Sequence, residues 1–321
     1  MADSGMTVPP EIPSRPPAQQ PPAEQRYTAF RGPNGIRAGW RVLIYLAICA
    51  ALFFVLLFGI GLVAPRHDLR VTQLTPLGTG IGEGFAFLLA ALAALIMARI
   101  ERRRFGVYGL PARSAFRGDF WTGGLVGFGS ISLVLLGIFT LHGFRITGVA
   151  MQGNTIPVAA VEWGLAFLLV GLAEEFSFRG YLQYTLTTGM GFWPSAALLS
   201  VLFAVAHAWN RGESRPGLIS IVGFALLFCL FLERRGTLWL AVGFHTGWDW
   251  GQTFFYGVPD SGLPAYYNLF NCSFHGPAWL TGGTVGPEAS VFTPIVLAIV
   301  ALLFAQVSRE VRYQADARPA G

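Results

Sequence analysis

The sequence predicts an all-α, polytopic membrane protein with about eight transmembrane helices. Of the 321 residues, 53% are hydrophobic and 12% are charged, and the mean hydropathy is +0.53. An ordinary soluble domain has about 25% charged residues, roughly twice this fraction. Apolar runs close to the roughly 20 residues needed to cross a bilayer recur along the chain. The composition therefore excludes an ordinary soluble domain.

Eight apolar runs have a suitable length. They lie at about 40–64, 81–99, 119–141, 157–178, 193–210, 217–232, 236–256 and 290–308. The first run is too long and too far from the N-terminus to be the core of a signal peptide, so we expect it to remain as a transmembrane helix. Each of the other runs is predicted to form one further spanning helix.

The two ends of the chain differ from the middle. Residues 1–26 contain seven prolines and almost no large apolar side chains, so they cannot bury enough surface to order themselves. We predict a disordered, proline-rich cytoplasmic tail over residues 1–36, a helical transmembrane domain over 37–312 and a short tail over 313–321. The longest loop, residues 257–289, is expected to be extracytoplasmic, and loops of this length are usually functional or disordered.

Positive charge is distributed unevenly between the predicted loops. The formal net charge of +5 rests on 22 arginines and no lysine, and these do not form a stripe suited to nucleic acid. With a cytoplasmic N-terminus, the inside segments hold Arg37, Arg41, Arg99, Arg102, Arg103, Arg104, Arg113, Arg117, Arg234, Arg235, Arg309 and Arg312. The outside loops hold only Arg66, Arg70, Arg145, Arg211 and Arg215. The positive-inside rule therefore predicts cytoplasmic N- and C-termini. Arginine without lysine and abundant Ala and Gly look bacterial, so we expect the inner (plasma) membrane.

Two adjacent glutamates interrupt the fourth apolar run. Because a charge in hydrocarbon costs a few kcal/mol or more, Glu174 and Glu175 indicate a functional site. On a helix Glu175 and Arg179 share a face, whereas Glu174 is rotated from Glu175 by about 100°. We expect Glu175 to be paired with Arg179 and Glu174 to face a cavity as a general base. A purely structural Glu–Arg pair at a helix end is the alternative.

Two later apolar runs each carry a histidine. His207 lies four residues after Phe203, and His245 lies four residues before Asp249, so each pair shares a helical face. Taken alone, His207 is more often a packed core residue, and His245 with Asp249 could be a packing pair. Because three such elements occur in order on separate spans, we predict that Glu174 and both histidines line one polar cavity.

These motifs resemble a known family. Glu-Glu-x-x-x-Arg at 174–179, Phe-x-x-x-His at 203–207 and His-x-x-x-Asp at 245–249 look like the three motifs of the CPBP intramembrane proteases. That family includes the CAAX prenyl endopeptidases and bacterial abortive-infection proteins. The resemblance spans roughly residues 157–256 and implies that residues 37–312 form a protease-like domain. The implied activity is that of an intramembrane CAAX-type endopeptidase, a hydrolase acting on membrane-associated or lipid-modified peptide substrates.

The resemblance also implies roles for the matching residues. Glu174, together with His207, would activate water for attack on a peptide carbonyl. Glu175 and Arg179 would support the site.

His245 and the residue at 249 would stabilise the tetrahedral oxyanion. The chain has Asp249 where the eukaryotic CAAX enzymes carry Asn. Because an ionised Asp repels an oxyanion, Asp249 is either protonated, or orients His245, or helps to hold a cation.

The same residues raise the question of a metal. Two histidines and a glutamate with an open position would suit a catalytic zinc. The three lie on separate predicted helices with no His-Glu-x-x-His pair, and Cys49, Cys229 and Cys272 lack metal-ligand spacing. We therefore expect no metal or other cofactor, with a zinc-dependent form of the protease as the alternative.

Two other classes of function compete with a protease. A non-catalytic relative that binds a membrane partner or confers immunity would keep the polar cluster for helix packing. A proton-coupled transporter often contains repeats, and none is evident here. The expected partners are membrane lipids and a membrane-associated peptide or protein, not nucleic acid. At about 1.5 Å per residue, Glu174 falls in the inner third of its predicted span and His207 in the outer third of its own, so a tilted, broken or re-entrant helix is required.

Overall fold

The computed structural model describes residues 28–32, 35–63, 73–210, 212–264 and 266–315. The long helices are α1 (Ala38–Val63), α2 (Pro76–Ile100), α3 (Gly118–Thr140), α4 (Thr155–Arg179), α5 (Tyr181–Met190), α6 (Phe192–His207), α7 (Arg215–Arg235), α8 (Trp239–Asp249) and α10 (Phe292–Val307). The predicted all-α class is confirmed. Of the predicted disordered tail over residues 1–36, residues 1–27 and 33–34 lie outside the described residues, and the described part contains the short strands β1 (Arg31–Gly32) and β2 (Gly35–Ile36).

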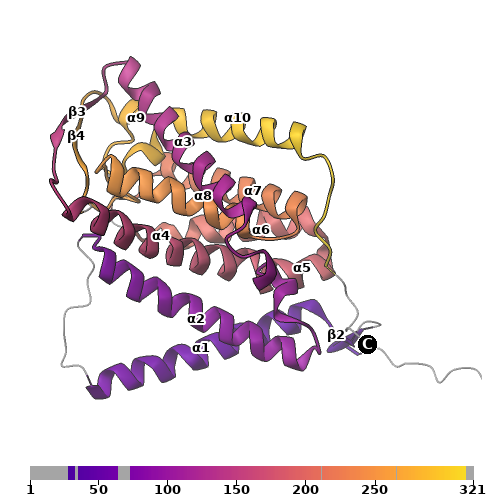
Figure 1. Cartoon of the computed structure of the whole chain (residues 1–321). Coiled ribbons are helices and arrows are strands. Elements are labelled where there is room, and N and C mark those ends of the chain that lie inside the picture. Colours follow the sequence, from indigo (N-terminus) through magenta and orange to yellow (C-terminus); the bar gives the residue numbers. More distant parts are fainter. Residues whose placement is uncertain (1–27, 33–34, 64–72, 211, 265, 316–321) are drawn as a thin grey trace, which may run out of the picture.

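The helices form one elongated bundle in which successive long helices run in opposite directions, except that α5 continues in the direction of α4 (Figure 1). Strand β2 (Gly35–Ile36) and the C-terminal end of the described chain lie at one end of the bundle, here named the terminal end (Figure 1). Strands β3 (Phe144–Val149) and β4 (Phe270–Phe274) and the short helix α9 (Ala278–Thr281) lie at the opposite end, here named the loop end (Figure 1). The two termini of the described chain therefore lie on the same side of the bundle.

Five helical segments are long and apolar enough to cross a membrane. They are Ala38–Gly61, Pro76–Ile100, Gly118–Thr140, Thr155–Met190 and Arg215–Arg235. Helices α6 and α10 have 16 residues each, about 24 Å at 1.5 Å per residue, which is shorter than a hydrocarbon core of about 30 Å. The chain is thus a multi-pass membrane protein, but the expected count of eight spans is not confirmed.

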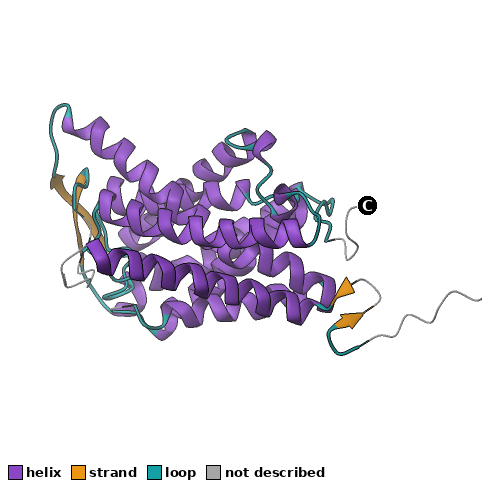
Figure 2. Cartoon of the chain, turned by 90° about the horizontal axis from the view of Figure 1, so that it is seen from below, coloured by secondary structure: helices purple, strands orange, loops and turns teal. Residues whose placement is uncertain are grey.

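Small antiparallel sheets lie at both ends of the bundle (Figure 2). At the terminal end, β1 (Arg31–Gly32) pairs with β2. At the loop end, β3 pairs with β4, so the segment between α3 and α4 is joined to the long loop. That loop is itself folded, since it contains β4, α9 and the single turn η4 (Pro287–Ala289). It is positioned to cover the loop end of the bundle.

Helix α8 lies at the centre of the bundle and packs closely against α3. Both helices carry a Gly-x-x-x-Gly pair, Gly123 and Gly127 on α3 and Gly243 and Gly247 on α8. A Cβ atom at Gly127 would lie 2.1 Å from the Phe244 carbonyl oxygen, and one at Gly247 would lie 2.1 Å from that of Gly124. Paired small residues of this kind let helix backbones approach in membranes. This glycine seam fixes the position of α8, which carries His245.

A break at Gly180 and the short helix that follows it remove the expected depth difference between Glu174 and His207. A Cβ at Gly180 would lie 2.3 Å from the Phe176 carbonyl oxygen, so the break requires glycine. Helix α5 continues beyond α4 toward the terminal end (Figure 1), and its 10 residues add about 15 Å. The 16 residues of α6 then return about 24 Å. His207 therefore lies about 9 Å back from the end of α4, measured toward the loop end. Glu174 lies about 8 Å back from the same point, so the two residues are at nearly the same depth.

Candidate active site

A cavity of about 150 Å³ lies between helices α2, α4, α6, α7 and α8 and residues of the long loop. Its polar lining includes Glu83, Glu174, His207, His245, Asp249, Asp260 and Glu288. The apolar lining is largely aromatic and includes Phe167, Phe203, Phe224, Phe228 and Trp248. A few convergent polar groups on apolar walls are typical of a binding or catalytic site.

Glu174 lies between the two histidines. Its Oε1 is 3.8 Å from Nε2 of His207, and its Oε2 is 3.6 Å from Nε2 of His245. The side chains are partly accessible, with exposed fractions of 25% for Glu174, 16% for His207 and 14% for His245. The structure thus brings together the three residues that the sequence places on separate helices.

The other ring nitrogen of each histidine has a fixed partner. Nδ1 of His207 lies 2.8 Å from the Phe203 carbonyl oxygen, and Nδ1 of His245 lies 3.1 Å from Oε1 of Glu175. Because a carbonyl oxygen only accepts, Nδ1–H of His207 must donate, which leaves its Nε2 facing Glu174. Such contacts set both the tautomer and the orientation of the ring.

Glu175 and Arg179 form a fully buried ion pair. Oε1 of Glu175 is 3.6 Å from Nη1 of Arg179, and both side chains have an exposed fraction of 0%. The guanidinium also lies over the Phe203 ring, 4.4 Å from its centroid. Among the described residues, the three guanidinium nitrogens make no hydrogen bond. The negative charge of Glu175 is therefore the main compensation for this buried cation.

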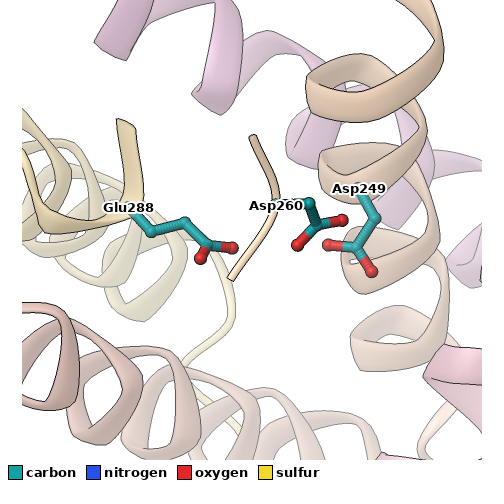
Figure 3. A group of neighbouring side chains, drawn as sticks. All are labelled: Asp249, Asp260 and Glu288. Carbon is teal, nitrogen blue, oxygen red and sulfur yellow. The ribbon is translucent and has the colours of Figure 1, made fainter. Parts of the chain in front are cut away.

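Asp249 contacts His245 and belongs to a group of three carboxylates. Its Oδ2 is 3.4 Å from Nε2 of His245, the contact expected of a carboxylate that orients the ring. Oxygens of Asp249, Asp260 and Glu288 lie within 4.8 Å of one another. Figure 3 shows Asp249 on a helix facing Asp260, with Glu288 pointing toward them from the other side.

Neutral donors hold the two loop carboxylates. Asp260 accepts a hydrogen bond of 2.9 Å from the Thr253 hydroxyl. Glu288 accepts hydrogen bonds from the backbone N–H of Ser261 at 3.0 Å and from its hydroxyl at 3.2 Å. Burial raises the pKa of both carboxyl groups.

The donor atoms do not form a compact zinc site at Glu174. Because zinc bonds are about 2.0–2.2 Å long, the atoms that bind one zinc ion must all lie within about 4 Å of one another. In the described part of the chain, the one group of three or more potential ligand atoms within 4.8 Å of one another is Asp249, Asp260 and Glu288. Three carboxylates suit a hard cation such as Ca²⁺ better than zinc. The combination of Glu174 with His207 and His245 therefore does not fit a preformed zinc site.

Three carboxylates that line the cavity are missing from the sequence prediction. Glu83 lies in the apolar run of α2, and the rule that singles out Glu174, an ionisable residue inside a span, applies to it equally. Asp260 and Glu288 lie in the long loop, where no helical or strand periodicity indicates which side chains face inward. Only folding of the loop onto the bundle brings them to the cavity.

The fold and the cavity define a multi-pass membrane protein with a carboxylate–imidazole site between its helices. Residues 156–251 match the family model described as type II CAAX prenyl endopeptidase Rce1-like. This match confirms the predicted resemblance to the CPBP proteases over that segment, and it supports a membrane protease. No curated protein matches the chain.

The matched segment has a clear structural meaning. It runs from the first turn of α4 through α8 and so contains Glu174, His207 and His245. It covers just under a third of the chain. Glu83 and Glu288 lie outside it, so the family match bears on the central residues of the cavity and not on its whole lining.

Proposed function

We propose that the protein is an intramembrane endopeptidase of the CAAX type, which hydrolyses peptide bonds of membrane-associated or lipid-modified substrates. The observation that carries this proposal is the position of Glu174, whose two oxygens face Nε2 of His207 at 3.8 Å and Nε2 of His245 at 3.6 Å. Both separations are longer than a hydrogen bond, as catalytic contacts often are before substrate binds and shortens them.

In the proposed first step, water binds beside Glu174 and His207. Glu174 takes a proton from this water, and the resulting hydroxide attacks the peptide carbonyl carbon. Nδ1–H of His207 is committed to the Phe203 carbonyl, so Nε2 is free to accept a hydrogen bond that orients the water. The proton then passes to the leaving amine as the C–N bond breaks.

His245 is positioned for the oxyanion. Its Nε2 donates to the developing negative charge only when the ring carries both protons. In that state Glu175 at 3.1 Å and Asp249 at 3.4 Å face its positive charge. We assign Asp249 an orienting role, because its carboxylate contacts the ring and would repel an oxyanion directly. Arg179 holds Glu175 in place.

This mechanism requires no metal ion. A carboxylate between two imidazoles supplies a base and a hydrogen-bond partner for the water, and the three side chains are not arranged as a compact zinc site. Zinc-dependent hydrolysis is the competing form of the same activity, and it predicts that a chelator removes activity.

We further propose that the protein lies in the inner (plasma) membrane with both termini in the cytoplasm. The arginine distribution supports this orientation, and the described ends of the chain lie on the same side of the bundle (Figure 1). The cavity is lined by Asp260 and Glu288 of the long loop, so its loop end would face the extracytoplasmic side. Its partners would be membrane lipids and a membrane-associated peptide or protein.

The test is a Glu174→Gln variant, which keeps the shape of the side chain but cannot take a proton. Cleavage of a membrane-tethered reporter should fall by about 10²–10⁴-fold, the usual contribution of a general base. Thermal stability in detergent should stay close to that of the wild type. Glu162→Gln is the matched control, because Glu162 lies on the same helix but is exposed on the outside of the bundle.

Three outcomes would contradict the proposal. Full activity of Glu174→Gln would rule out the glutamate base. Loss of wild-type activity with chelator and recovery with zinc would establish the metal-dependent form. A folded wild type that cleaves no tethered reporter would favour the non-catalytic partner-binding or immunity protein.

A further inference from the structure

The cavity carries more acidic than basic side chains. The two imidazoles of His207 and His245 are the basic groups in its described lining. The carboxylates in the same lining are Glu83, Glu174, Asp249, Asp260 and Glu288. Two of these, Glu174 and Asp249, contact a histidine.

In the described part of the chain, the other three carboxylates form no ion pair or hydrogen bond with a basic side chain. Asp260 and Glu288 accept hydrogen bonds from Thr253 and Ser261, which are neutral donors. Within the described chain, no hydrogen bond or ion pair joins Glu83 to another side chain, although its span is otherwise apolar. Because buried or intramembrane carboxylates are normally paired, this excess of acid points to a cation supplied from outside the protein.

The walls of the cavity indicate the kind of cation. Phe203, Phe224, Phe228 and Trp248 line it together with the carboxylates. Arginine and lysine carry a long apolar stem and a charged head, so they fit a site with apolar walls and carboxylates. Their charged groups are also attracted to aromatic faces. A divalent metal bound by Asp249, Asp260 and Glu288 would use neither these walls nor Glu83.

We propose that the cavity binds an arginine or lysine side chain of the substrate, so that the enzyme selects peptides with a basic residue close to the scissile bond. Glu83, Asp260 and Glu288 are the specificity-determining residues. This inference rests on the proposed protease function, because it names the substrate class of the same site. It also implies that a negatively charged carboxylate of the substrate is disfavoured in the cavity.

The experiment compares lipid-anchored, fluorescent peptides that differ at one position. One series carries arginine at successive positions and the other carries citrulline, a neutral residue of nearly the same shape. Binding to the full chain in zwitterionic nanodiscs is measured by fluorescence anisotropy with Glu174→Gln, which should not turn the peptides over. The chain has a formal net charge of +5, so its charge as a whole does not favour a cationic peptide.

At one or more positions, the arginine peptide should bind about tenfold or more tightly than its citrulline partner. This preference should fall severalfold when Glu83→Gln or Asp260→Asn is added. The matched Glu162→Gln change, outside the cavity, should leave it intact. With the wild type, the arginine peptide should also have the higher kcat/KM, mainly through a lower KM.

Equal binding of arginine and citrulline peptides at every position would overturn the inference. It would also fail if Glu83→Gln and Glu162→Gln reduced the preference equally. Equal binding together with Ca²⁺ binding that Asp260→Asn removes would identify a metal site instead. Failure of the proposed function has a different signature, in which the arginine preference persists but the wild type cleaves neither peptide.

Discussion

Two groups of charged side chains lie inside the bundle, and they differ in how their charges are balanced. At the terminal end, Glu101 accepts hydrogen bonds from Arg41 at 2.9 and 2.5 Å and lies 3.3 Å from Arg103. The Tyr181 hydroxyl donates to the same carboxylate. In the cavity, by contrast, five carboxylates face two imidazoles.

The comparison separates a structural use of charge from a functional one. At the terminal end each of these charged groups lies within ion-pair distance of an opposite charge. In the cavity the excess carboxylates keep unused acceptor capacity, which costs stability and is retained only where it serves binding or chemistry. On this comparison, the paired charges at the terminal end have a structural role, and the cavity with its excess carboxylates is the candidate site.

The Glu175–Arg179 pair tests this separation most strongly, because it is paired like the terminal group but borders the cavity. Glu175→Gln should lower the free energy of unfolding by about 3–5 kcal/mol, because it leaves the fully buried Arg179 without a counter-charge. Activity should fall as well, since the anchor of Nδ1 of His245 is weakened. Thermal unfolding in detergent and reporter cleavage measure the two effects.

The same change at Glu174 is the control for that experiment. Glu174→Gln should abolish cleavage without a comparable loss of stability, because Glu174 is partly exposed and has no buried arginine partner. Equal destabilisation by the two variants would mean that the adjacent glutamates are not divided into a structural and a chemical role.

Much of the fold was predictable, because membrane helices are specified by long apolar runs. Each of the eight apolar runs in the sequence corresponds to a helix, with boundaries a few residues apart in seven of them. In the run 236–256, α8 ends at Asp249 and a π-helical segment continues to Phe255. Helix α5 has no counterpart among the eight runs. The convergence of Glu174, His207 and His245 was also predictable, since ionisable residues in such runs are rare. Glu83 meets the same criterion as Glu174, so its presence in the cavity was equally predictable.

The remaining features depend on three-dimensional packing. The break at Gly180 and the return of α6 bring His207 level with Glu174, and no local pattern indicates a helix that starts beyond the end of its predecessor. The contribution of Asp260 and Glu288 depends on how the long loop folds back, which the positions of its glycines and prolines do not specify. Pairwise contacts between distant segments decide both.

The glycine seam behind the cavity provides a second test, which asks whether close packing of α3 and α8 positions His245. Gly127→Ala places a Cβ 2.1 Å from the Phe244 carbonyl oxygen and 2.9 Å from the Trp248 nitrogen, so α3 and α8 must separate. Overpacking of this kind costs about 1–3 kcal/mol. Because α8 carries His245, activity should fall more steeply than stability.

Gly129→Ala is the matched control on the same helix, because a Cβ there meets no atom within 4 Å. It should leave melting temperature and reporter cleavage close to those of the wild type. If both alanine variants behaved alike, close approach of α3 and α8 would not be what positions the site.

The smallest effect is expected at the terminal end itself. Glu101→Gln keeps an acceptor oxygen but removes the charge that faces Arg41 and Arg103. Their side chains are each 7% exposed, against 0% for Arg179, so water can reach them more readily. We therefore expect a loss of about 1–2 kcal/mol, between the values for exposed and fully buried pairs.

Cleavage per folded molecule should not change, because the network lies away from the cavity. Specific activity, normalised to the folded fraction from a thermal melt, decides the matter: a fall in that quantity would mean that the terminal end is coupled to the site and is more than a structural joint.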